Sequence, residues 1–267
     1  MNINIQKILT FKFKPDKYTY IAIILGVISV FLSIYLKNFS SLLGKFFIRD
    51  FLQISVVGII IPFIIISKAK FSFSELGLRF DNAHKYILTS MFLGFLFSFF
   101  FTKGDPNKLN ALLQTKNIGP ALYVMTANIY EVIFFFIFLR FYFEKAFGIL
   151  PSIGLAAIFY SLHHAGFQPQ FIKLFIVGLV FISIFRITNH WLICFPLWWV
   201  GGVCDVIIMS PDVTRPAGIN GWRCLPVLII IVAMFYLKYP FKVNNKIITN
   251  GEAKVNCTKY SKAGFWL

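Results

Sequence analysis

Three ionisable side chains, Glu131, His163 and Asp205, lie in stretches of the sequence that are otherwise strongly apolar. The chain has ten acidic residues and four histidines, and Glu131 and Asp205 are the acids that fall well inside apolar runs. An ionisable group at membrane depth is costly and usually has a function, so these residues predict a site. A carboxylate can take a proton from water, and a histidine across a cavity can stabilise the oxyanion that forms, which together is hydrolytic chemistry.

The frame that positions these groups is predicted to be a bundle of membrane helices. The chain has 267 residues, of which 58% are hydrophobic and 13% charged, with a mean hydropathy of +0.76. This is too little charge to cover a soluble domain, so the expected class is an all-α polytopic membrane protein. About eight apolar runs, several shorter than the ~20 residues of an untilted span, predict about eight transmembrane helices. The runs are Tyr18–Tyr35, Phe51–Ser67, Ile87–Phe101, Ala121–Phe141, Ile149–Ala165, Phe171–Phe185, His190–Met209 and Cys224–Tyr239.

Composition along the chain predicts three regions. Residues 1–17 form a basic lead-in, residues 18–239 the transmembrane helical domain, and residues 240–267 a polar, lysine-rich tail. The first apolar run is too long for the core of a signal peptide and has no clear cleavage site. It is therefore expected to be an uncleaved first span.

The charges predict an orientation and exclude one class of partner. The net charge is +16, but the 26 lysines and arginines lie between apolar runs rather than in one patch. We interpret them as headgroup contacts, and nucleic-acid binding is not expected. More of them fall in segments that are cytoplasmic if the N-terminus is inside, which predicts an integral protein of the plasma membrane with both ends inside.

Alternation of helix direction predicts that the polar groups share one half of the bilayer. Glu131 lies about ten residues into its span, roughly 15 Å below the face where that helix enters. The next span runs the opposite way and ends at His163, and Asp205 lies near the end of a span parallel to it. All three side chains then fall in the same half, which favours a single polar site.

Simpler interpretations stay open for each of these groups. Glu131 could hydrogen-bond a neighbouring helix, and Asp205 could be an ordinary interfacial acid. His163 and His164 are adjacent and point about 100° apart on a helix, so one of them is expected to be a bystander.

Two charged connections are expected beside these spans. Residues 36–50 would join the first two spans outside the membrane, and residues 140–148 would break the chain after the fourth. Arg140 and Glu144 in that break would be a solvated pair four residues apart. The phenylalanine-rich run Phe134–Phe143 would be a lipid-facing or packing surface.

Around these residues the chain resembles the CPBP family of intramembrane proteases, which includes CAAX prenyl proteases and bacteriocin-processing enzymes and is also called the ABI family. The family pattern is a Glu-Glu-x-x-x-Arg helix, then Phe-x-x-x-His, then His-x-x-x-Asn or Asp. Phe159-Tyr-Ser-Leu-His163 matches the second motif, Glu131 stands at the first glutamate, and Asp205 stands at the last position. The resemblance covers about residues 70–210, which would be the CPBP-like core.

Three positions depart from this pattern. Val132 stands at the second glutamate, Phe136 at the arginine and Gly201 at the histidine of the third motif. Aligning Glu131 with the second glutamate instead puts Tyr130 in the first place and restores no arginine.

The resemblance implies an intramembrane endopeptidase that cleaves a peptide or a membrane-associated, for instance lipidated, substrate. Glu131 would activate the water, His163 would support the tetrahedral intermediate, and Asp205 would orient that histidine or the water. Candidate supporting residues are His164, Phe159 and Tyr130. The expected partners are the lipid bilayer and a peptide or membrane-protein substrate.

No cofactor is expected for this chemistry, and a divalent metal such as zinc is the alternative. Glutamate, histidine and aspartate are all zinc ligands, so Glu131, His163 and Asp205 would be the ligands if a metal were bound. The second class of function is a catalytically inactive CPBP-like membrane scaffold or bacteriocin-immunity protein, which the three departures favour. A third class, a small transporter, would need broken helices or an inverted repeat, and neither is evident.

Overall fold

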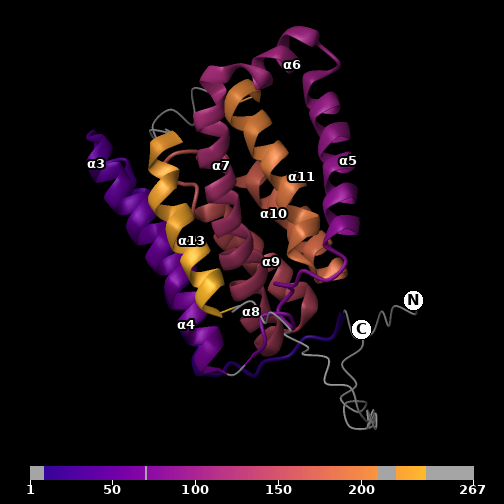
Figure 1. Cartoon of the computed structure of the whole chain (residues 1–267). Helices are drawn as coiled ribbons and strands as arrows, with labels where there is room; N and C mark the ends of the chain where they lie inside the picture. Colours follow the sequence, from indigo (N-terminus) through magenta and orange to yellow (C-terminus); the bar gives the residue numbers. More distant parts are fainter. Residues whose placement is uncertain (1–8, 70, 210–220, 239–267) are drawn as a thin grey trace, which may run out of the picture.

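The computed structural model describes residues 9–69, 71–209 and 221–238, and no strand occurs in these ranges. Their helices form one bundle, with most axes along the long dimension of the molecule (Figure 1). The predicted all-α class is thus confirmed for this part of the chain.

Short connections join successive helices at the two ends of the bundle. Three segments, η1, η3 and η4, have π-helical hydrogen bonding, which is rare in proteins and is frequently found at functional sites. In chain order the elements are α2 Lys17–Leu36, α3 Leu42–Lys45, η1 Phe46–Ile60, α4 Ile61–Lys68, α5 Ala83–Thr102, α6 Pro106–Leu113, η2 Thr115–Asn117, α7 Ile118–Glu131, η3 Val132–Leu139, α8 Arg140–Phe147, α9 Ile149–Leu162, α10 Phe171–Thr188, α11 Trp191–Cys204, η4 Asp205–Met209, η6 Gly221–Arg223 and α13 Cys224–Lys238.

Six helices in the described ranges are long and apolar enough to cross a membrane. They are Lys17–Leu36, Leu42–Lys68, Ala83–Thr102, Thr115–Phe147, Phe171–Thr188 and Trp191–Ile208. The two remaining predicted spans correspond to shorter apolar helices, Ile149–Leu162 and Cys224–Met234. The fold therefore indicates a membrane protein with six helices of spanning length in its described part.

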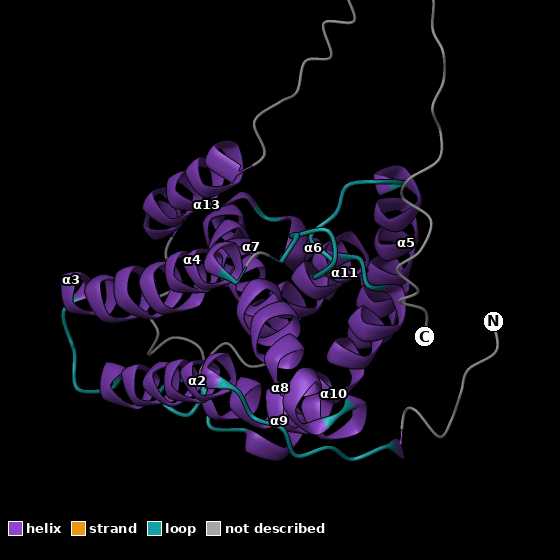
Figure 2. Ribbon diagram, turned by 90° about the horizontal axis from the view of Figure 1, so that it is seen from below, coloured by secondary structure: helices purple, strands orange, loops and turns teal. Residues whose placement is uncertain are grey.

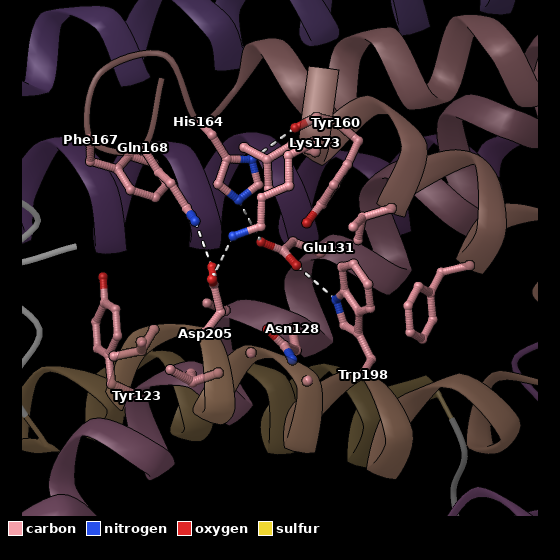
Figure 3. A pocket seen from close by; sticks show the side chains of 18 of the residues that line it. Tyr123, Asn128, Glu131, Tyr160, His164, Phe167, Gln168, Lys173, Trp198 and Asp205 are labelled. Atoms are coloured by element: carbon pink, nitrogen blue, oxygen red, sulfur yellow. Dashed lines mark hydrogen bonds and ion pairs between the residues drawn. The ribbon is translucent and has the colours of Figure 1, made fainter. Parts of the chain in front are cut away.

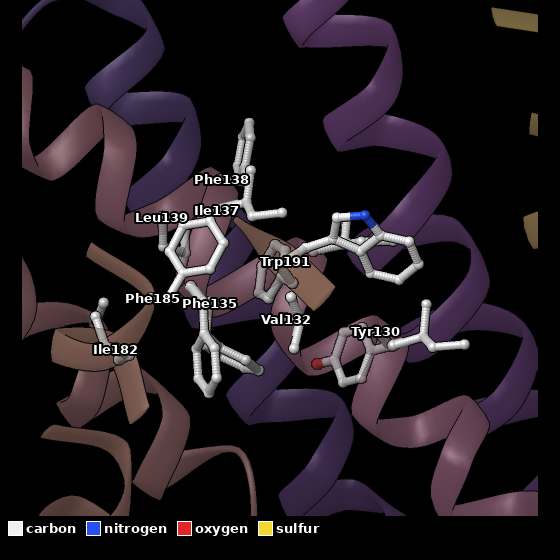
Figure 4. Packing of buried hydrophobic residues seen from close by; sticks show 14 of the residues in the cluster. Tyr130, Val132, Phe135, Ile137, Phe138, Leu139, Ile182, Phe185 and Trp191 are labelled. Carbon is white, nitrogen blue, oxygen red and sulfur yellow. The ribbon is translucent and has the colours of Figure 1, made fainter. Parts of the chain in front are cut away.

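The helix Thr115–Phe147 is the centre of the bundle. Seen from below, its α7 and α8 parts are enclosed by α2, α4, α9, α10 and α11 (Figure 2). In η3 the side chains of Phe134, Phe135, Phe136 and Phe138 have no exposed surface. Figure 4 shows Phe135 and Phe138 among residues from neighbouring helices, so this run is packing surface rather than lipid-facing surface.

The predicted break at residues 140–148 is wrong, because the central helix continues through α8 and turns only at Gly148. Gly148 has a φ of 96°, a conformation that residues with a side chain rarely adopt. A Cβ at this position would also lie 2.3 Å from the carbonyl oxygen of Thr10. The turn therefore requires glycine, and it makes α8 and α9 the two arms of a tight helical hairpin.

The predicted solvated pair of Arg140 and Glu144 is a buried network instead. Arg140 is 4% exposed, and its Nη1 donates to Glu144 Oε2 at 2.6 Å. Arg186 of α10 donates twice to the same carboxylate, at 2.7 Å each. The one carboxylate accepts hydrogen bonds from both arginines, so the helix carries these charged groups without a break.

The predicted outer connection at residues 36–50 is also partly wrong. Residues 42–68 form one helix, so Arg49 and Asp50 lie inside it and are buried. Asp50 has no exposed surface and accepts hydrogen bonds from Tyr123 (2.7 Å) and from Arg223 Nε (2.5 Å). These contacts join η1 to α7 and to η6, and they explain how the charges of Asp50 and Arg223 fit within the bundle.

Candidate functional site

The hairpin at Gly148 brings Glu131 level with the two histidines. Glu131 lies 17 residues before Gly148, and His163 and His164 follow it by 15 and 16 residues. Since the two arms are antiparallel helices with the same rise per residue, these side chains reach the same height. The short α9 ends at Leu162, so the histidines lie inside the bundle rather than at its end.

The Glu131 carboxylate is the centre of the site. Its Oε1 lies 3.5 Å from His163 Nε2 and 3.6 Å from His164 Nε2. Its Oε2 accepts a hydrogen bond of 2.8 Å from the indole Nε1 of Trp198 in α11 (Figure 3). Glu131, His163 and His164 are each at most 5% exposed. One histidine was predicted to be a bystander because adjacent helical side chains diverge. The structure differs, since both imidazoles approach the carboxylate.

The carbonyl oxygen of Tyr160 determines which imidazole nitrogens carry protons. It lies 2.5 Å from His163 Nδ1 and 2.9 Å from His164 Nδ1. A carbonyl only accepts hydrogen bonds, so both Nδ1 atoms must donate. In the neutral tautomer each Nε2 then presents a lone pair toward Glu131.

These three residues have the arrangement of a metal-binding group. One ligand atom from each lies within 4.8 Å of the others. Ligand atoms bound to a tetrahedral zinc ion are separated by roughly 3.3–3.6 Å, close to the distances from the carboxylate to the two imidazoles. A histidine ligand usually donates its second nitrogen to a carbonyl, as both do here to Tyr160. The residues that could hold a metal are therefore Glu131, His163 and His164. The predicted set had Asp205 in place of His164.

A cavity of about 120 Å³ lies against this group. Glu131 and His164 line it, together with Asp205, and Figure 3 shows these side chains around one space. Of the three polar groups predicted to share a bilayer half, Glu131 and Asp205 therefore line one cavity. His163 approaches Glu131 but is not among the residues that line this cavity.

Asp205 reaches this cavity but contacts other residues than predicted. It accepts hydrogen bonds from Gln168 Nε2 (2.5 Å) and Lys173 Nζ (2.7 Å). Lys173 is 38% exposed at its side chain, so the cavity approaches the outside of the bundle there. The described contacts do not join Asp205 to a histidine, so the expected role of orienting His163 is not seen.

The motif positions that depart from the family pattern have two different surroundings. Val132 and Phe136 have no exposed surface and belong to the hydrophobic core. Gly201 lines the cavity, where a Cβ would lie 3.2 Å from the ring of Phe97. Of the three departing positions, only the one at Gly201 therefore faces the site.

The two predicted supporting residues outside the cavity contribute to packing. The Tyr130 hydroxyl is 2.9 Å from Ser29 Oγ, and its ring lies 5.9 Å from that of His163. Phe159 packs against Phe143 at 5.8 Å and is not among the cavity-lining residues.

Sequence reasoning missed Arg49 and Asn128 as parts of the site, and it left Trp198 open between a pocket wall and a membrane-interface residue. All three line the cavity. Asn128 is one helical turn before Glu131, and this spacing is the signal that could have identified it. Arg49 and Trp198 come from other helices, and their approach depends on tertiary packing.

No protein-family model, curated protein or solved structure matches this chain. Its function must therefore be inferred from the site itself.

Proposed function

We propose that this protein is an intramembrane endopeptidase of the CPBP type, which hydrolyses a peptide bond of a peptide or membrane-associated substrate. The observation that supports this most directly is the approach of both His163 and His164 to the Glu131 carboxylate at the wall of a buried cavity. A carboxylate beside two imidazoles in a low-dielectric space is suited to activating water.

In this reaction the Glu131 carboxylate takes a proton from a water molecule in the cavity while the hydroxide oxygen adds to the peptide carbonyl. The tetrahedral oxyanion then needs hydrogen-bond donors. The Asn128 side chain is one turn away on the same helix and supplies an N–H group, and a protonated His164 would supply another. Transfer of the proton from Glu131 to the leaving amine completes the cleavage.

The same residues would hold a divalent cation such as zinc, with Glu131, His163 and His164 as ligands. A bound zinc ion would supply a water molecule already activated for attack. In that case Glu131 would act as a ligand instead of as the base, and Trp198 would orient its second oxygen.

The test is cleavage of a complex peptide mixture by the purified protein in proteoliposomes, with new termini identified by mass spectrometry. Glu131→Gln, His163→Ala and His164→Ala should abolish the wild-type cleavages at normal protein levels. Glu75→Gln and His84→Ala are the matched controls, because both residues are exposed and lie outside the cavity. Full cleavage by Glu131→Gln would refute the proposed function.

The second candidate is a non-catalytic scaffold or a factor conferring immunity to a bacteriocin-like peptide. The burial of Val132 and Phe136 in the core favours it, because the charged residues of the first motif have been replaced by packing residues. A phenotype that survives Glu131→Gln, with no cleavage by the wild type, would select this candidate.

We further propose that α9 and α13 also lie in the membrane, which gives about eight embedded helices as the apolar runs predict. The distribution of lysine and arginine supports the plasma membrane with both termini in the cytoplasm. Cysteine labelling at Lys108 and at Lys145 from opposite sides of the membrane tests this orientation.

A further inference from the structure

The cavity contains a buried positive charge without a matching negative partner. Arg49 is 6% exposed and lines the cavity, and it forms no ion pair within the described residues. Its Nη1 is buried and has no hydrogen-bond partner there. A buried, unpaired arginine is destabilising, particularly inside a membrane.

The acid next to it in the sequence, Asp50, is already engaged by other residues. Its two oxygens accept from Tyr123 and Arg223, so this cluster of two arginines and one aspartate keeps a positive charge. The other basic residue of the cavity, Lys173, is paired with Asp205 at 2.7 Å. Glu131, the remaining acid of the cavity, contacts Trp198 and the two histidines, so Arg49 is the cavity cation without an ion pair among the described residues.

A second unsatisfied group in the cavity is also a donor. Asn128 is 5% exposed, and its Nδ2 has no hydrogen-bond partner among the described residues. Buried polar groups are nearly always satisfied, so a ligand rich in acceptor oxygens is expected here.

The aromatic residues around Arg49 hold its side chain in place. The guanidinium carbon lies 3.7 Å from the ring centre of Phe167 and 5.8 Å from that of Tyr123. The ring of Phe167 in turn lies 5.1 Å from that of His164. The guanidinium is therefore within roughly 9 Å of the His164 imidazole, a span that an extended peptide covers in two to three residues.

We propose that Arg49 is a specificity residue that binds a carboxylate of the peptide substrate, two to three residues from the bond that is cleaved. The distance from the cleaved bond rests on the proposed function. The binding of a carboxylate by Arg49 does not depend on it. A carboxylate is small enough for the cavity and complements a fixed guanidinium. It could come from the end of the peptide or from an acidic side chain.

The test is a binding experiment in the Glu131→Gln background, which is not expected to cleave. The probes are two pairs of short apolar peptides. The first pair is a peptide with a free C-terminal carboxylate and its C-terminal amide. The second pair is two C-terminal amides, one with an internal glutamate and one with an internal glutamine. Binding is measured by the ligand-induced rise of the unfolding temperature in detergent. One acidic peptide should bind roughly tenfold to a hundredfold more tightly than its neutral counterpart. The terminal and internal acids distinguish the two sources of the carboxylate.

Arg49→Gln should abolish this preference for the acidic peptide, and Arg49→Lys should retain part of it. Arg79→Gln, which removes a partly exposed arginine outside the cavity, should leave the preference unchanged. Arg49→Gln should also unfold near the wild-type temperature without peptide, since it removes an unpaired buried charge. Equal binding of acidic and neutral peptides would overturn the inference, and so would a severe loss of stability in Arg49→Gln. Stabilisation by inorganic phosphate or phosphatidic acid alone would overturn it in favour of a phosphate ligand.

The same set of proteins separates this inference from the proposed function. Carboxylate-selective binding without any cleavage by the wild type would support the Arg49 site and refute the peptidase. Cleavage of acidic and neutral peptides at equal rates, unchanged in Arg49→Gln, would refute the Arg49 site alone.

Discussion

The loop that carries the site is held against α2 at a point where only glycine fits. A Cβ on Gly166 would lie 1.6 Å from the carbonyl oxygen of Ser33 and 2.5 Å from its carbonyl carbon. These are backbone atoms, so no side-chain rotation relieves the overlap. The Gly166 N–H also donates to Ser33 Oγ at 3.2 Å. Gly166→Ala must therefore move the loop that contains His164 and Gln168.

The expected loss of unfolding free energy is about 2–4 kcal/mol, from overpacking together with a lost hydrogen bond. The assay is reversible unfolding in detergent micelles, followed by tryptophan fluorescence. Gly154→Ala is the matched control, since a Cβ at Gly154 in α9 meets nothing within 4 Å. That variant should be as stable as the wild type or gain about 0.5–1 kcal/mol, because glycine disfavours a helix.

Equal stabilities of Gly166→Ala and Gly154→Ala would refute the close packing of the loop on α2. If Gly166→Ala is destabilised but still cleaves substrate at the wild-type rate, the packing of the loop on α2 does not affect the geometry of the site. Both effects together are expected, because the loop and the histidines form one continuous segment.

Three further outcomes follow from contacts of the site and its frame. Asp50→Asn should lower the unfolding free energy by about 3–5 kcal/mol, because it leaves Arg223 buried without its ion pair, and denaturant titration measures this. Trp198→Phe should lower it by about 1–3 kcal/mol, because the buried Glu131 carboxylate loses a hydrogen bond of 2.8 Å; a value near zero would contradict that contact. If the site takes zinc, metal analysis of the purified protein should find about one ion per chain and almost none in His164→Ala, and zinc retained in that variant would exclude the three-residue ligand set.

Much of the frame could be predicted because hydrophobic length is a strong signal. The runs at Tyr18–Tyr35 and Ile87–Phe101 correspond closely to helices Lys17–Leu36 and Ala83–Thr102. The shared location of Glu131 and Asp205 also followed from alternation of helix direction alone.

The errors arose where charges are neutralised by partners from distant segments. Arg140 was assigned to a break because its pair with Glu144 was expected to be solvated, and Arg186, which binds the same carboxylate, is 46 positions away from Arg140 in the sequence. Arg49 and Asp50 were assigned to a connection because Arg223 and Tyr123 could not be identified as neighbours. A hydropathy pattern shows that a residue is charged but not which residue pairs with it. A buried ion pair within a helix is therefore easily taken for the end of that helix.

The approach of His164 to Glu131, a residue predicted only as supporting, was not expected for a different reason. Adjacent residues diverge on an ideal helix, but α9 ends at Leu162 and both histidines lie in the turn that follows. Their Nδ1 atoms share the Tyr160 carbonyl oxygen, which directs both Nε2 atoms toward Glu131. The similar spacing of Glu131 and the histidines about Gly148, 17 residues on one side and 15 and 16 on the other, is the sequence signal that indicates this meeting.

The central claim is that Glu131 and His164 act as one catalytic unit. The most direct measurement is kcat/KM for peptide cleavage by the wild type, Glu131→Gln, His164→Ala and the double variant. Residues that act as a unit have strongly non-additive effects, so the double variant should be no slower than the slower single variant. Losses that multiply in the double variant, or a wild-type rate in Glu131→Gln, would contradict the account.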